Sequence, residues 1–198
     1  MSVIGAINLT VERTQFSLTN GTAPAAAVDL EPNHPGQQLT NVSFIDCWSY
    51  GNRGGGFTGF LAHLDSSTVP IDVTVRNWTS RRQSRAEGRT ADSAHDGRDM
   101  YGFAFGKLGN GLRGAISIVD SVVTDSYNSG IYVDDKSESN RVIFKKVSLN
   151  ATCWSGYCHS HPVMAPVYFR QLHAKTMDNI SMEQCEVRTQ PRNRSICN

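Results

Sequence analysis

The stretch from Ala27 to Phe60, AVDLEPNHPGQQLTNVSFIDCWSYGNRGGGFTGF, decides the fold because it contains the unit that the rest of the chain repeats. It holds two runs in which apolar and polar residues alternate, Val28–Glu31 and Val42–Asp46. Alternation leaves one face of each run apolar, as a half-buried β-strand requires, and turn-forming residues follow both runs. So short a unit cannot cover its own apolar face and needs copies stacked on both sides.

Copies of the second run recur along the whole chain. The apolar pairs align as Leu9/Val11, Val42/Phe44, Val73/Val75, Ile116/Ile118, Val142/Phe144 and Ile180/Met182, at steps of 26 to 43 residues. The residue three positions past each pair is predicted to lie inside or at the corner of a coil; these residues are Thr14, Cys47, Trp78, Ser121, Val147 and Cys185. Insertions at Arg81–Asp99 and Cys153–Met164 account for the two long steps.

Copies of the first run are expected at residues 60–63, 103–106, 131–134 and 167–170. Two strands per repeat, with no helical period of 3.6 residues anywhere, predict an all-β chain folded as a parallel β-solenoid. The 198 residues fit a single domain, 1–198.

Three segments resemble the right-handed parallel β-helix repeats of the pectin-lyase-like superfamily: NVSFIDCWSYGN (41–52), ISIVDSVVTDSYNSGIYV (116–133) and AVDLEPN (27–33). The resemblance covers roughly Ile7 to Val187 and implies a right-handed parallel β-helix of about six coils. Members include pectate lyases, polygalacturonases, alginate epimerases and phage tailspikes, so the resemblance also implies a polysaccharide partner. Complete enzymes of this superfamily usually have more coils and a capping helix. A segment of a longer solenoid, with uncapped ends open to association, therefore stays an alternative.

Composition narrows the possible partners. The net charge of +1 and the pI of about 7.7 do not favour nucleic acid, and no apolar run approaches the length of about 20 residues that a membrane span needs. The N-terminus shows no secretory signal, but seven N-x-S/T sequons and the resemblance favour an extracellular or secreted protein.

Alternate residues of the first run are expected to point outward, so that stacked coils form two outward columns. One column is predicted to read Asp29, Leu61, Ala104, Tyr132 and Tyr168. The other is predicted to read Glu31, His63, Gly106, Asp134 and Arg170, with Lys107 and Asp135 one residue further on.

These columns hold the residue types that chemistry on an acidic polysaccharide requires. The predicted catalytic residues are His63, as a base oriented by Glu31, and the carboxyls of Asp134 and Asp135. The predicted substrate-binding residues are the cations Arg170, Lys107 and Arg98, the aromatic platform of Tyr132 and Tyr168, and Asp29.

Two classes of function stay open. The first is a polysaccharide lyase, epimerase or hydrolase. The second is a non-catalytic, glycan-binding or structural β-helix segment of a larger extracellular or viral fibre protein. The motifs of the superfamily's enzymes are incomplete, since Asp134-Asp135 is the single counterpart of the polygalacturonase set and no Gly-His-Gly exists. Outward polar residues that simply face water are the structural alternative.

The insertions add weaker candidates. Ser80–Asp99 carries five arginines that would clamp an anionic polymer, or it is a solvated loop. Cys153–His161 has the composition of a zinc site, but a local Cys153–Cys158 disulfide or free thiols are the favoured explanation, and no metal site is predicted. Calcium at Asp134 and Asp135 is the one cofactor left open.

Overall fold

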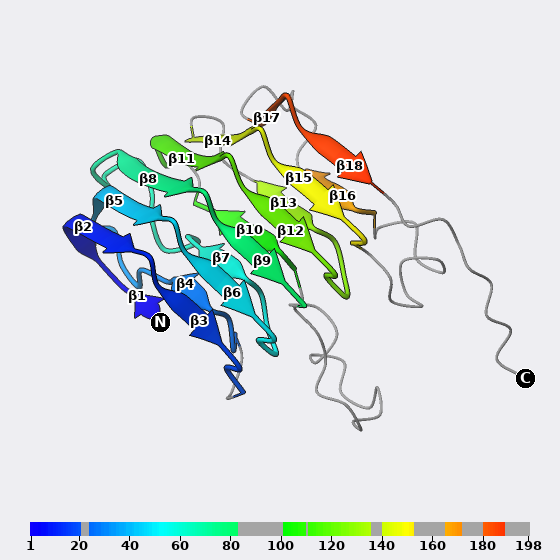
Figure 1. Cartoon of the computed structure of the whole chain (residues 1–198). Coiled ribbons are helices and arrows are strands. Elements are labelled where there is room, and N and C mark those ends of the chain that lie inside the picture. The colour runs from blue at the N-terminus through cyan, green and yellow to red at the C-terminus, as the bar shows by residue number, and fades with distance from the viewer. Residues whose placement is uncertain are drawn as a thin grey trace, which may run out of the picture.

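The computed structural model describes residues 1–20, 24–82, 101–109, 111–135, 140–152, 165–171 and 180–188. Within these ranges every regular element is a β-strand, and the strands form three parallel six-stranded sheets. Each coil contributes one strand to each sheet, in the order sheet A, sheet B, sheet C (Figure 1). The chain is therefore an all-β, right-handed parallel β-helix of six coils, as the sequence predicts.

The strands of each sheet follow one another along the solenoid axis. Sheet A contains β1 (Ser2–Val3), β4 (Val28–Leu30), β7 (Phe57–Phe60), β10 (Phe103–Leu108), β13 (Ile131–Asp135) and β16 (Val167–Gln171). Sheet B contains β2 (Ala6–Glu12), β5 (Leu39–Ile45), β8 (Ile71–Arg76), β11 (Gly114–Val119), β14 (Asn140–Lys145) and β17 (Ile180–Glu183). Sheet C contains β3 (Gln15–Ser17), β6 (Trp48–Tyr50), β9 (Thr79–Arg81), β12 (Val122–Thr124), β15 (Ser148–Asn150) and β18 (Glu186–Arg188).

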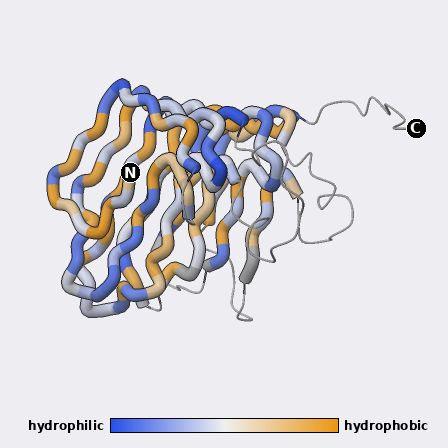
Figure 2. The backbone as a smooth tube through the Cα atoms, turned by 90° about the horizontal axis from the view of Figure 1, so that it is seen from below, coloured by the Kyte–Doolittle hydropathy of each residue, from blue (hydrophilic) through white to orange (hydrophobic). Residues whose placement is uncertain are grey.

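Sheet B follows the alignment expected from the repeated apolar pairs. Leu9 pairs with Val42, Val42 with Val73, and the register continues without a shift through Ile116 and Val142 to Ile180. The pairs in the four central coils are buried, and Figure 2 shows hydrophobic and hydrophilic residues alternating along the strands. Alternation places one set of side chains inside the coil and the other outside.

The corner between sheets B and C is made by two residues in every coil. The first has a left-handed backbone conformation, with φ of 54° at Asp46, 52° at Asn77 and 50° at Asp120. The second points inward, and at this place Trp78 and Ser121 are buried. The Ser121 hydroxyl donates to the carbonyl of Val119 (2.8 Å) and accepts the N–H of Trp78 (3.1 Å). The predicted corner column is confirmed.

Aromatic rings fill the interior of the first coils. Trp78 stacks on Phe16, with ring centroids 5.8 Å apart, and meets the rings of Phe44 and Phe57 edge to face at 6.3 Å and 5.4 Å. Edge-to-face and offset-stacked geometries are the favourable ones for aromatic pairs, so this cluster holds sheets A, B and C together across the core.

The prediction for sheet A was wrong in the third coil. Val28 pairs with Phe57, so β7 begins three residues before the expected run at 60–63. Phe57 takes the buried position, and the missing side chain of Gly59 leaves space that the Phe105 ring of the next coil occupies. An added Cβ at Gly59 would lie 3.1 Å from the Phe105 ring. An apolar position filled by a neighbour's side chain is not visible in the sequence of the strand itself.

Candidate functional site

The outer face of sheet A carries the candidate site. Its first column, in register down five strands, is Asp29, Thr58, Ala104, Tyr132 and Tyr168. Its second column is Phe60, Gly106, Asp134 and Arg170, and Glu31 follows the last residue of β4 beside it. The predicted columns are thus correct except in the third coil. There, Thr58 and Phe60 stand where Leu61 and His63 were expected.

Two carboxyl groups meet at the N-terminal end of this face. The Thr58 hydroxyl donates to Asp29 Oδ1 (2.9 Å). Burial raises the pKa of Asp29 to about 6, the hydrogen bond from Thr58 opposes this rise, and the charge of Glu31 and a hydrogen bond with it add to the rise. Because only 6% of Asp29 is exposed, the half-buried Glu31 is the more accessible member of the pair. Asp29 therefore keeps its proton up to about pH 6.

A stack of three tyrosine rings lies further along the same face. Tyr132 stacks on Tyr101 with ring centroids 4.8 Å apart and planes 18° apart, and on Tyr168 at 5.7 Å and 30°. Since its neighbours come from the coils on either side, both faces of the Tyr132 ring are covered. The Tyr132 ring is therefore packed between two protein rings, and an aromatic platform for a substrate stays a prediction.

Tyr101 is a member of the site that the sequence did not indicate. It precedes β10 and lies outside the alternating run, so the period of two does not assign its direction. Its ring nevertheless packs on Tyr132, whose register partner in β10 is the small Ala104. The small Ala104 beside Tyr132 leaves room for the Tyr101 ring, and this becomes visible only once the register of β10 and β13 is known.

Asp134 lies near the tyrosine stack and is 6% exposed. Its Oδ1 is buried and has no hydrogen-bond partner among the described residues. A buried carboxylate oxygen without a partner is costly, and such groups in native proteins call for a partner such as water, an ion or a ligand. Its register partners are Gly106 on one side and Arg170 on the other.

Two of the predicted catalytic residues, Glu31 and Asp134, lie in different coils. Glu31 belongs to the second coil and Asp134 to the fifth, about 14 Å apart at the usual strand spacing. Two glycosidase carboxyls stand about 5 to 9.5 Å apart, so Glu31 and Asp134 do not act as such a pair. His63 is exposed in the loop between β7 and β8, where its ring lies 6.2 Å from that of Phe60.

Four predicted residues stay predictions. The side chains of Lys107, Asp135 and Arg170 lie outside the described part of the structure, which gives only their places in β10, β13 and β16. Arg98 falls in 83–100, which also lies outside it, as does the cysteine- and histidine-rich segment 153–164.

The described residues show few features that would point to a cofactor or to a membrane. In the described ranges no three histidine, cysteine, aspartate or glutamate side chains come together as metal ligands, so the calcium hypothesis rests on Asp134 and Asp135 alone. The same part of the chain contains no helix of the length and apolarity needed to cross a bilayer. Cys47 and Cys185 are free thiols.

Comparisons with protein-family models, with curated proteins and with solved structures found no match to the chain. The fold alone therefore assigns the class, which is a parallel β-helix protein with a polar and aromatic outer face on sheet A.

Proposed function

We propose that this protein is a carbohydrate-active β-helix of the pectin-lyase-like kind, which acts outside the cell and binds an acidic polysaccharide along the outer face of sheet A. The observation that carries the proposal is the register of this face, which aligns carboxyl, hydroxyl and aromatic side chains in two straight columns over five coils. Columns spaced by about 4.8 Å per coil offer one set of contacts after another to an extended polymer.

Different residues of the face would make different contacts with the polymer. Tyrosine hydroxyls donate and accept hydrogen bonds with sugar hydroxyls, and ring edges pack on the sugar. The cations of Arg170 and Lys107 pair with uronate or sulfate groups of the polymer. The raised pKa of Asp29 lowers the negative charge of the face near pH 6, which reduces its repulsion of an anionic chain.

A catalytic function is the second candidate, and the Asp29–Glu31 pair favours it. A carboxyl whose pKa is raised to about 6, in contact with a second carboxyl, is an arrangement in which one group donates a proton and the other accepts one. In a lyase, epimerase or hydrolase, the accessible Glu31 would contact the polymer, and Asp29 beside it would hold the proton.

Binding is tested by titrating the protein with pectate, alginate and glycosaminoglycan fragments in a calorimeter. We expect one of these polymers to bind and Tyr168→Ala to weaken binding about fivefold to tenfold, as loss of about 1 kcal/mol of aromatic contact does. Gly106→Leu should also block binding, because a Cβ at Gly106 meets nothing within 4 Å and the new side chain projects from the face.

The matched control is Trp48→Ala, which removes an exposed aromatic side chain from sheet C and should leave binding of the acidic polymer unchanged. If no acidic polymer binds, or if Tyr168→Ala and Gly106→Leu bind as well as the wild type, sheet A is not the polysaccharide face.

The catalytic candidate needs a separate measurement. Unsaturated products are followed by absorbance and reducing ends by a chemical assay, with the polymer that binds. Turnover that is lost in Glu31→Gln supports catalysis at the carboxyl pair. Binding without turnover in either assay rejects the enzyme and leaves the non-catalytic, glycan-binding protein.

A further inference from the structure

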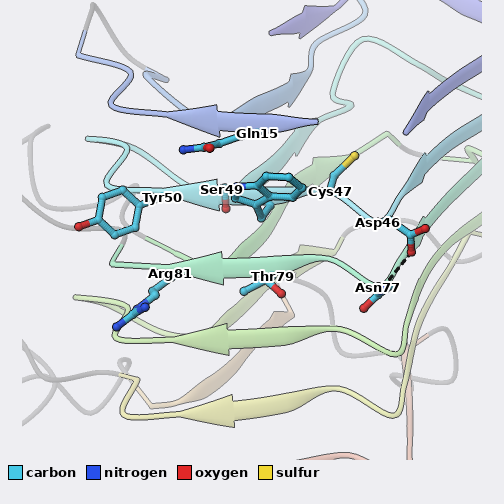
Figure 3. Close-up of a pocket in the computed structure, with 9 residues that line it drawn as sticks. Gln15, Asp46, Cys47, Ser49, Tyr50, Asn77, Thr79 and Arg81 are labelled. Carbon is cyan, nitrogen blue, oxygen red and sulfur yellow. Dashed lines mark hydrogen bonds between the residues drawn. The ribbon is translucent and has the colours of Figure 1, made fainter. Parts of the chain in front are cut away.

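A shallow groove of 610 Å³ lies on the outer face of sheet C, over β3, β6 and β9. Figure 3 shows Tyr50 and Arg81 toward one end of the groove, Asp46 and Asn77 toward the other, and Gln15 and Thr79 between them. The centre is a register column in which Trp48 lies between Gln15 in the preceding coil and Thr79 in the following one. Nothing in the repeat pattern of the sequence indicated this groove.

Trp48 is the most unusual residue of the groove. It occupies an outward strand position and is 40% exposed, whereas the other described tryptophan, Trp78, is fully buried in the core. No aromatic ring of the described residues stacks on Trp48, in contrast to Tyr132 on sheet A. A large exposed aromatic side chain inside a concave surface is typical of a binding site, since tryptophan supplies a large contact area at little cost in conformational entropy.

The charged groups of the groove have partners within the protein. Arg81 Nε lies 3.9 Å from Asp125 Oδ2, and Asn77 Nδ2 donates to Asp46 Oδ1 (2.8 Å). The next residue, Arg82, donates from Nη1 to the Tyr50 hydroxyl (3.3 Å). The residues that line the groove include one carboxylate, Asp46, and one guanidinium, Arg81, so the groove has no excess of either sign. This charge balance favours an uncharged ligand over an anionic or cationic one.

The remaining chemistry of the groove is that of hydrogen bonding beside an aromatic surface. Gln15 offers an amide, Thr79 a hydroxyl and Tyr50 a phenol, all on the same side of the sheet as Trp48. A sugar ring presents C–H groups on its faces and hydroxyls around its edge. The C–H face would pack on the indole, and the hydroxyls would bond to the surrounding amide, hydroxyl and phenol groups.

We propose that this groove is a second carbohydrate site, which binds an uncharged oligosaccharide with a sugar ring packed on Trp48. The sugar ring on Trp48 lies between Gln15 of the preceding coil and Thr79 of the following one, which are each about 4.8 Å away at the coil spacing. The site does not rest on the function proposed for sheet A, since it differs in sheet, in ligand charge and in the residues that make contact.

The test uses neutral gluco-, manno- and galacto-oligosaccharides as probes, added to the full chain while intrinsic tryptophan fluorescence is recorded. We expect one series to change the fluorescence in a saturable way with a dissociation constant below about 1 mM, the range of weak specific ligands. Trp48→Ala should weaken binding at least tenfold, measured by calorimetry, and Gln15→Ala about threefold. Trp48→Phe, which keeps an aromatic ring at this position, should restore part of the affinity.

Two controls make the outcome decisive. Tyr168→Ala on sheet A should bind the neutral oligosaccharide as the wild type does, and Trp48→Ala should still bind an acidic polymer if sheet A binds one. Because Trp48 is exposed, Trp48→Ala should keep its unfolding midpoint, and Gln15→Ala repeats the test if it does not. The proposal is overturned if no neutral series binds at an oligosaccharide concentration tenfold above the expected dissociation constant. It is also overturned if Trp48→Ala and Gln15→Ala bind as tightly as the wild type.

Discussion

At the scale of single residues, Asp29 connects the candidate site to the stability of the fold. Its carboxyl is buried between Thr58 and Glu31, and its pKa is raised from the ordinary value of 3.8 to about 6. Between pH 4 and 6 the folded protein therefore binds more protons at Asp29 than the unfolded chain does. Stability falls as the pH rises through this window, because the folded state must then hold a buried negative charge.

Asp29→Asn should remove this loss of stability. Asparagine keeps an oxygen that accepts the Thr58 hydrogen bond but carries no charge. We expect the stability of the variant, relative to the wild type, to increase by about 1 to 2 kcal/mol between pH 4 and pH 7.5. Urea unfolding at both pH values measures the change.

Asp65→Asn is the control, because the contribution of Asp65 to stability changes with pH in the opposite direction to that of Asp29. Hydrogen bonds from Ser67 lower the pKa of Asp65, so its contribution is present at neutral pH and is lost as the pH falls through the lowered pKa. Equal pH dependence of Asp29→Asn and the wild type would show that the Asp29 carboxyl is not shifted.

At the scale of elements, the end of β10 depends on one glycine. A Cβ added at Gly109 would lie 1.7 Å from the carbonyl oxygen of Leu64, in the loop that follows β7. That carbonyl directly follows a tight turn in which the Leu64 N–H donates to the carbonyl of Leu61 (3.2 Å). The loops of neighbouring coils are thus packed backbone to backbone at this point.

We expect Gly109→Ala to cost about 3 kcal/mol or more, as other substitutions that force a buried backbone apart do. The matched control, Gly106→Ala, lies three residues earlier in β10 with open space around its Cβ position and should change stability by less than about 0.5 kcal/mol. Thermal unfolding of both variants compares them directly, and equal midpoints would contradict the close approach of the two loops.

The elements also show why the sequence predicted one sheet better than another. Sheet B has long strands with bulky inward pairs such as Val42 and Phe44, so its alternating pattern appears in every coil. The prediction for sheet A was wrong at β7, where Gly59 takes an inward position and the Phe105 ring of the next coil fills the space beside it. Contacts between coils decide such positions, and a pattern within one strand does not contain them.

The same reason explains what was missed in the candidate sites. Tyr101 joins the tyrosine stack through a ring contact with the neighbouring coil, and the groove at Trp48 exists because Gln15 and Thr79 lie on either side of it in register. Residue types alone suggested Tyr132, Tyr168 and the acidic residues. Their arrangement required the register of the sheets.

At the scale of the whole molecule, the strands of each coil pair only with those of the coils before and after it. The inward residues of the central coils are fully buried, whereas Leu9 and Phe16 in the first coil and Ile180 and Met182 in the sixth are only partly buried. Stability in such a solenoid is close to a sum over coils and their interfaces, so coils with one neighbour are held less strongly than coils with two.

We expect amide hydrogen exchange to follow this gradient. Protection should be highest in β8 and β11 of the third and fourth coils and should fall toward β2 and β17, because local opening is easiest where the fewest apolar contacts are lost. Exchange followed by mass spectrometry or NMR measures it. Uniform protection across the six coils would indicate one fully cooperative unit instead.

The stacking of the three sheets in register, with a shift only at Gly106/Leu108 between β10 and β13, also bears on how this architecture can change in length. A tandem duplication of the stretch from the left-handed residue Asn77 to the residue before its counterpart Asp120 would insert one complete turn and restore every strand pairing on both sides of the insertion. Such an insertion would extend the sheet A face and the sheet C face by the same increment. The length of such a binding surface therefore changes by whole coils. Gene rearrangement or protein engineering can set this length through the number of coils.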